Sequence, residues 1–124
     1  MNQNDIIRSI SSSSTFSKII DSWTNNSGIS LKNTSGSYLS FFSYCLIQEK
    51  NGNHLFILPD KEDAAYFFNN LENLHKDEKG TTILFYPGSY RRPYQIEEID
   101  NANIMLRAEV LNVIQKRRKN TLVV

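Results

Sequence analysis

Two short apolar runs, each closed by a proline, constrain the fold of this chain most strongly. The first run, HLFILP, ends at Pro59, and the second, TTILFYP, ends at Pro87. Continuous apolar runs of this length are typical of strands that are covered on both faces, as in a parallel sheet. An amphipathic segment follows each run, so predicted strand and predicted helix alternate. This alternation predicts parallel strands joined by right-handed crossovers.

Two further strands are predicted at the ends of the alternation. Ile29 and Leu31 begin it, and TLVV, Thr121 to Val124, ends it. The order β-α-β-α-β-α-β predicts a three-layer α/β/α fold with a parallel sheet of about four strands. The last strand would be an open edge of that sheet. Because it stops without a following turn, we expect the sequence to be a cloned piece of a larger protein.

Three amphipathic helices are predicted between these strands. Asp60 is placed to cap the second helix, with Glu62 and Asp63 in its first turn, and the third helix begins near Ile96. The predicted buried stripes are Leu39, Phe42, Ser43, Leu46 and Ile47 in the first helix, Ala64, Phe67, Phe68, Leu71 and Leu74 in the second, and Ile99, Ala102, Leu106, Val110, Val113 and Ile114 in the third.

The segment before these elements has a different composition. SSSST is a low-complexity turn or loop. After it, Phe16, Ile19, Ile20 and Trp23 recur at helical spacing, and TNNSG then breaks the pattern. We therefore predict a Ser-rich N-terminal segment with a short amphipathic helix at residues 1–27, and an α/β domain at residues 28–124.

Composition and charge narrow the functional classes. The chain has 124 residues, with 14 Lys and Arg against 13 Asp and Glu, so its net charge of +1 creates no field that attracts nucleic acid or an anionic membrane. The single cysteine, Cys45, cannot form an internal disulfide, which fits a reducing compartment. No apolar run approaches the roughly 18 residues of a membrane span, and the N-terminus lacks the features of a signal peptide. We expect a cytoplasmic protein.

The turn NTSGSYLS is the first candidate site. It keeps one glycine, Gly36, before a predicted helix, which is the context of a phosphate-binding loop. The lysine that such a loop needs is not present, because Tyr38 stands near its position and Lys32 precedes the turn. A helix N-terminus can still attract an anion. The residues favour a polar turn that caps a helix.

The loop YPGSYRRPYQ is the second candidate site. It follows the end of a predicted strand, where parallel sheets usually place ligand sites. Arg and Tyr side chains stack on bases and grip phosphates, and they are also enriched in protein contacts. We predict partner contact for Tyr90, Arg91, Arg92 and Tyr94. Two alternatives remain open: the tyrosines pack on the sheet edge while the arginines pair with Glu97, Glu98 or Asp100, or the loop contacts nucleic acid.

The remaining polar residues do not specify chemistry. KRRK, Lys116 to Lys119, is the type of cation run that a helix C-terminus favours. His54 and His75 have no partners at metal-ligand spacing, and Cys45 has no neighbouring base in the sequence. We predict no catalytic residues, no cofactor and no metal site in this segment.

Three stretches carry a resemblance to a known family. FILPDKEDAAYFFNNLENL, LFYPGSYRRPYQIEEIDNANIMLRAEVLNVI and the final TLVV resemble the N-terminal region of the bacterial transcription-repair coupling factors, the Mfd family, in its Bacteroidetes form. The likeness covers roughly Ile29 to Val124, and RRPYQIEEIDNANIMLRAEVL is its most specific part. That region is similar to the first domain of the excision-repair helicase UvrB. The resemblance thus implies a truncated UvrB-like, RecA-like (P-loop NTPase-like) half-domain.

The resemblance also implies a function. Members of this family are ATP-dependent DNA translocases that displace stalled RNA polymerase and recruit UvrA in transcription-coupled nucleotide excision repair. Their motor, which uses ATP and Mg, lies downstream of a segment like this one. The segment would be non-catalytic scaffolding that supports the adjacent UvrA-binding subdomain and helps to hold the parent in its resting state. Its partners would be other domains of the parent chain, whereas UvrA, RNA polymerase and DNA are partners of the full-length protein.

Specific residues match or depart from the family pattern. Thr34, Ser35, Gly36, Ser37 and Tyr38 resemble its degenerate P-loop, with Tyr38 where UvrB has its lysine. UvrB tests damaged DNA with a long hairpin, whereas here only a short loop follows Tyr86, so we expect no lesion recognition. The segment stops before the UvrA-contacting subdomain, and direct UvrA binding is not expected. Two alternatives remain open: a nucleotide-binding helicase or NTPase fragment, and a stand-alone α/β protein-interaction module.

Overall fold

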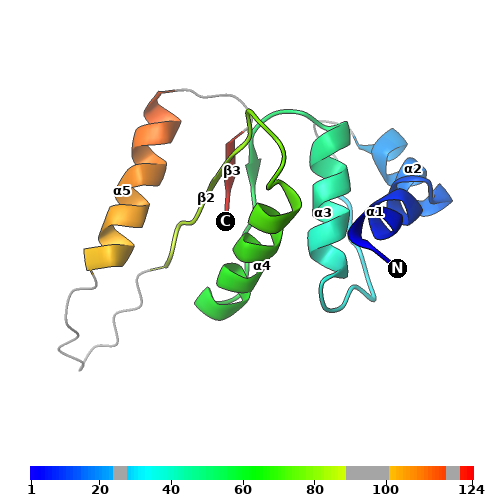
Figure 1. Ribbon diagram of the computed structural model, residues 1–124, viewed down its shortest axis with the longest axis horizontal. Helices are drawn as coiled ribbons and strands as arrows, with labels where there is room; N and C mark the ends of the chain where they lie inside the picture. The colour runs from blue at the N-terminus through cyan, green and yellow to red at the C-terminus, as the bar shows by residue number, and fades with distance from the viewer. Residues whose placement is uncertain (24–27, 89–100, 117–120) are drawn as a thin grey trace. The chain divides into compact units, whose positions relative to one another are not determined.

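The computed structural model describes residues 1–23, 28–88, 101–116 and 121–124, and helices dominate them. Two compact units are present, Met1–Asn51 and Gly52–Val124, so the second unit begins later than residue 28, where the sequence analysis placed the α/β domain. The elements, labelled in Figure 1, are α1 (Gln3–Ser11), α2 (Ser14–Ser22), α3 (Tyr38–Glu49), β1 (His54–Leu55), α4 (Lys61–Leu74), β2 (Thr82–Leu84), α5 (Asn101–Gln115) and β3 (Thr121–Val123).

The first unit begins with a helix that the sequence analysis did not predict. A capping box fixes the start of α1: the Asp5 N–H donates to Asn2 Oδ1 (2.9 Å), and the Asn2 N–H donates to Asp5 Oδ2 (3.0 Å). The Ser-rich stretch is where α1 ends and α2 begins. Ser13 caps α2, because its hydroxyl accepts the Phe16 N–H (3.2 Å).

The core of the first unit joins α1, α2 and α3. Phe16 and Phe42 meet edge to face with ring centroids 5.6 Å apart, and Ile10 and Cys45 complete the buried cluster. The Cys45 thiol lies 3.7 Å from the carbonyl oxygen of Ile7, and burial raises its pKa. Cys45 is therefore a packing residue.

The expected first strand is not formed. Ile29 and Leu31 lie outside any helix or strand and are 37% and 38% exposed. The helix expected after them is present as α3, with Phe42, Ser43, Leu46 and Ile47 buried, whereas Leu39 is 39% exposed.

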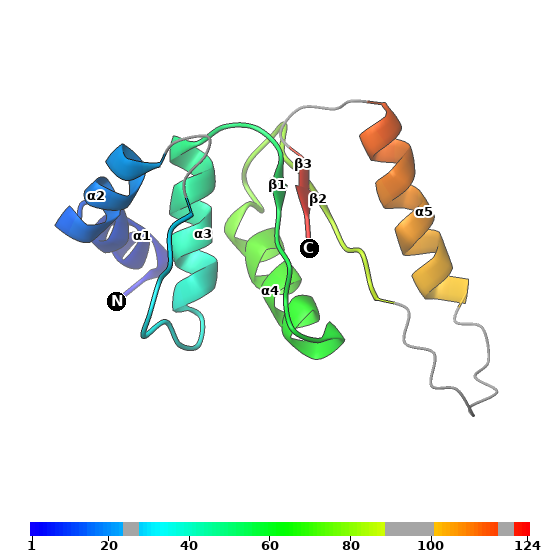
Figure 2. The same ribbon diagram turned by 180° about the vertical axis from the view of Figure 1, so that it is seen from behind.

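The second unit contains a small parallel sheet in the order β1-β3-β2. β3 pairs with both neighbours, with His54 opposite Leu122 and Thr82 opposite Thr121. Figure 2 shows the sheet from the side opposite to Figure 1. β3, the last strand, is the central strand of this sheet. The prediction that it would be an open edge is therefore wrong, and β1 is one of the two edge strands among the described residues.

Side chains beyond the strands contact two helices of this unit. The ring of Phe56 lies 5.1 Å from that of Phe67 on α4, and the ring of Phe85 lies 5.5 Å from that of Phe68 on the same helix. The next residue, Tyr86, has the guanidinium of Arg107 on α5 5.1 Å from its ring centroid. Leu71 of α4 and Val110 of α5 are the most deeply buried helical residues here, at 0% and 2% exposed.

The predicted three-layer α/β/α, RecA-like half-domain with about four parallel strands is wrong. The described residues are mostly helical, with five helices and three strands of only two or three residues. The apolar run HLFILP is not covered on both faces, because Leu55 and Ile57 are 69% and 87% exposed. An apolar run alone does not define how many of its residues pair with a neighbouring strand. Because β3 has only three residues, it limits the length of its pairing with β1 and with β2.

Candidate functional site

A cavity of the second unit lies at the carboxyl ends of its three parallel strands. We call it the carboxyl-edge cavity; its volume is about 470 Å³. This is the edge at which parallel sheets usually bind ligands. The lining residues come from the end of β1 and the segment after it, the start of α4, the segment after β2, and the end of β3 with Val124: Leu55, Phe56, Ile57, Leu58, Pro59, Asp60, Lys61, Ala64, Phe85, Tyr86, Pro87, Gly88, Val123 and Val124.

Backbone hydrogen bonds continue the sheet into the walls of this cavity. The Phe56 N–H donates to the carbonyl of Val123 (2.8 Å), and the Tyr86 N–H donates to the carbonyl of Val124 (2.7 Å). The Val124 N–H in turn donates to the carbonyl of Leu84 (2.9 Å). The backbone frame of the cavity is therefore fixed by the ladder, although these residues lie beyond the short strands.

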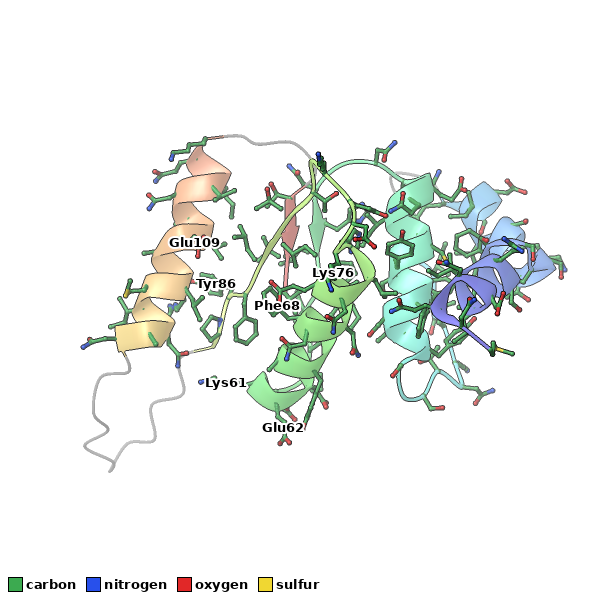
Figure 3. All side chains as sticks on the ribbon, viewed as in Figure 1. Lys61, Glu62, Phe68, Lys76, Tyr86 and Glu109 are labelled. Atoms are coloured by element: carbon green, nitrogen blue, oxygen red, sulfur yellow. The ribbon has the colours of Figure 1, made fainter. Side chains whose placement is uncertain are left out.

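The two charged side chains of the lining have partners within the unit. Asp60 caps α4, since its Oδ1 accepts the Asp63 N–H (2.8 Å). The ammonium of Lys61 donates to Oδ1 of Asn103 on α5 (3.3 Å). Figure 3 labels Lys61 near the start of α4 and Tyr86 beside α5. These contacts leave an apolar and aromatic lining for a ligand, the composition typical of small-molecule pockets.

The start of α4 does not favour an anion. A helix N-terminus attracts phosphate through its free N–H groups and its dipole. Here Asp60 already occupies the cap, and Glu62 and Asp63 add two carboxylates in the first turn. The positive end of the helix is therefore neutralised by acids of the chain itself, and the cavity is poorly suited to a nucleotide phosphate.

The cap gives a direct stability prediction. We expect Asp60→Ala to lower the free energy of unfolding by about 1 kcal/mol, because the Asp63 N–H loses its acceptor. Equilibrium urea unfolding followed by circular dichroism would measure this loss. Asp60→Asn is the matched control, because it keeps an acceptor oxygen and should retain most of the stability. Equal losses in both variants would mean that the carboxylate charge matters more than the cap.

The first predicted site lies in the other unit, in the turn before α3. Gly36 has φ +57°, a left-handed conformation that explains why glycine stands there. Ser37 is the N-cap residue of α3 but makes no side-chain cap hydrogen bond, and the Tyr38 ring stacks on Phe42 with centroids 6.1 Å apart. No strand precedes this turn in residues 28–37, so the strand-turn-helix context expected for Thr34 to Tyr38 is not present.

The second predicted site cannot be placed. Tyr90, Arg91, Arg92 and Tyr94 lie outside the described residues, as do Ile96, Ile99 and the cations at positions 117–119. The described part of that loop, Tyr86 to Gly88, lines the carboxyl-edge cavity. From the sequence, Tyr86 was named as part of a candidate site and Asp60 only as a helix cap, whereas Phe56 and Lys61 were missed. Both apolar runs end in a proline, at Pro59 and Pro87. This repeated pattern was the signal that could have indicated that the two runs line the same cavity.

Neither a metal centre nor a known relative narrows the function of the described residues. Among the described residues, no three His, Cys, Asp or Glu side chains gather as a metal site would require. None of the described helices is long and apolar enough to cross a membrane. Protein-family models, curated proteins and solved structures contain no match to this chain.

Proposed function

We propose that this chain is a non-catalytic N-terminal module of a bacterial transcription-repair coupling factor. The parent acts in the cytoplasm as an ATP-dependent DNA translocase that displaces stalled RNA polymerase and recruits UvrA. The local role is scaffolding: the module contacts other domains of the parent chain and helps to hold it in its resting state.

One observation supports the proposed role in contacting other domains of the parent chain. The carboxyl-edge cavity occupies the position where parallel sheets bind nucleotides, but its charged side chains are engaged in structure and the adjacent helix start is acidic. Such a cavity accommodates apolar groups of a partner better than a triphosphate. The resemblance of FILPDKEDAAYFFNNLENL to the family supports the choice of parent, and this stretch runs from the cavity wall through α4.

An immunoblot of native cell extract with an antibody raised against residues 1–124 tests the proposed parent. We expect a single band far larger than the 14.3 kDa of this chain. Deleting the corresponding coding region should then impair strand-specific repair while the motor still hydrolyses ATP. A band at the size of this chain would exclude the translocase assignment.

Thermal unfolding with Mg-ATP separates this role from the NTPase alternative. A ligand present at 100 times its Kd stabilises the native state by about 2.7 kcal/mol. We expect no rise in Tm with millimolar Mg-ATP, because neither the turn at Thr34 to Tyr38 nor the carboxyl-edge cavity offers a free cation for the phosphates. A rise of several degrees would favour a nucleotide-binding fragment.

A further inference from the structure

Asn51 and Gly52 form the chain's single Asn–Gly pair. The pair lies between Lys50, the C-cap residue of α3, and β1, in a stretch without helix or strand. The Asn51 side chain is exposed to solvent. Because glycine lacks the Cβ that shields the backbone nitrogen of other residues, an asparagine side chain can reach the nitrogen of a following glycine. A reaction between the two residues of this pair is therefore sterically open.

No hydrogen bond holds either reacting group. In the described part of the chain, neither Asn51 nor Gly52 takes part in one. Among the described residues, no heavy atom apart from those of the chain neighbours lies within 4 Å of the place that a Cβ on Gly52 would take. The Gly52 φ of +136° also favours glycine at this position. The Asn51 carboxamide can thus approach the Gly52 nitrogen without breaking a hydrogen bond of the fold.

Asn53 provides a contrast in the same stretch, since its side chain is exposed as well. Its Oδ1 accepts the N–H of Thr121 on β3 (3.0 Å), and the next residue, His54, begins β1. A reaction at Asn53 would first have to break this hydrogen bond and deform the start of the strand. The fold therefore holds one of the two exposed asparagines and leaves the other open.

We propose that Asn51 is a site of spontaneous deamidation. The Gly52 nitrogen, after losing its proton to a base in the solvent, attacks Cγ of Asn51. A bond forms between this nitrogen and Cγ, and the bond from Cγ to the side-chain nitrogen breaks. The side-chain nitrogen takes up a proton and leaves as ammonia. The product is a cyclic succinimide that joins the two residues.

Water then opens the succinimide at one of its two carbonyl carbons. Addition at Cγ gives aspartate at position 51, whereas addition at the backbone carbonyl carbon gives isoaspartate, through whose side chain the backbone continues to Gly52. Either product carries a carboxylate in place of the amide. This new charge directly follows the C-cap of α3, where the helix dipole disfavours an anion, and Glu49 already ends that helix. The modification does not depend on the proposed repair role.

Measurements of intact mass and of hydroxylamine cleavage on the full chain test this site. During incubation at mildly alkaline pH, we expect the mass to rise as the amide becomes a carboxylate, and the chain to elute earlier from a cation-exchange column. Hydroxylamine attacks the succinimide and should cut the chain into residues 1–51 and 52–124. Peptide mapping at acidic pH, where the reaction is slow, should place the change at Asn51 and find Asn53 unmodified.

Two variants and one condition serve as controls. Asn51→Gln keeps an exposed amide but would need a larger ring, so it should lose both the mass change and the cleavage. Asn51→Asp carries the charge from the start and should elute with the aspartate product. The parent sequence unfolded in urea gives the rate without any protection by the fold. We expect the native chain to convert at a similar rate, because no hydrogen bond holds the pair in the described part of the chain.

Two results would overturn the proposal. The first is a conversion that is much slower in the native chain than in urea, because the fold would then protect Asn51 or Gly52. The second is an unchanged mass increase in the Asn51→Gln variant, which would place the reaction at another residue.

Discussion

Replacing Leu71 with alanine is expected to lower the free energy of unfolding by about 2–5 kcal/mol. Leu71 is 0% exposed and lies on the buried face of α4 with Phe67. Removing three buried carbons loses their transfer free energy and leaves a cavity that the neighbours fill only in part. Domains of this size are stable by only about 5–15 kcal/mol, so this change is a large part of the total. Equilibrium urea unfolding followed by circular dichroism would measure it.

Two control variants make this result specific to packing. Tyr66 is on the same helix and 63% exposed, so Tyr66→Ala should change the free energy of unfolding by only about 0.5 kcal/mol. Leu71→Met keeps most of the volume and should cost less than about 1.5 kcal/mol. If Leu71→Ala were as mild as Tyr66→Ala, the packing of α4 in this unit would be wrong.

The helices with strong local signals were predictable from the sequence. α4 has a capping aspartate at Asp60 and apolar residues at helical spacing, and the structure begins the helix directly after that residue. α3 was predicted from its apolar stripe and from the polar turn before it, although Ser37, its N-cap residue, makes no side-chain cap hydrogen bond. α1 was missed although Asn2 and Asp5 form a capping box, since Asn at the cap and Asp three residues later is a weaker form of the usual pattern.

The strands were less predictable because their pairing is not local. HLFILP and TTILFYP were correctly placed near strands, but the extent of pairing depends on β3, which is distant in the sequence. Ile29 and Leu31 have strand-like character and no partner strand among the described residues. The exposure of Leu55 and Ile57 likewise depends on what lies beside the sheet, and composition does not encode that.

The carboxyl-edge cavity lies where the general rule for parallel sheets places ligand sites, and Tyr86 to Gly88, the described part of the second candidate loop, line it. The rule indicates this edge of the sheet, but it does not test the predicted site. The contents of the cavity did not follow from the sequence, because the contact of Lys61 with Asn103 and that of Tyr86 with Arg107 join residues on different elements. The four residues predicted for partner contact, Tyr90, Arg91, Arg92 and Tyr94, lie outside the described range and stay predictions.

The core of the first unit gives the second large effect, expected from Phe42→Ala. The Phe42 ring is 5% exposed, meets Phe16 edge to face at 5.6 Å and stacks with Tyr38. Truncating a buried phenylalanine costs about 3–5 kcal/mol, and the aromatic pair contributes about 0.5–1.5 kcal/mol beyond its buried area. We therefore expect a loss of about 3–5 kcal/mol in the free energy of unfolding.

Trp23 makes this loss measurable within the first unit, because it is the chain's single tryptophan and the C-cap residue of α2. Urea unfolding of Phe42→Ala followed by its fluorescence should show a midpoint far below that of the parent sequence. Leu39→Ala, on the same helix but 39% exposed, should shift the midpoint much less. Phe16→Ala and Phe42→Ala together should cost less than the sum of the single losses, because each single variant already breaks the edge-to-face pair. Additive losses would instead mean that the two rings stabilise the unit independently, through their contacts with Ile10 and Cys45.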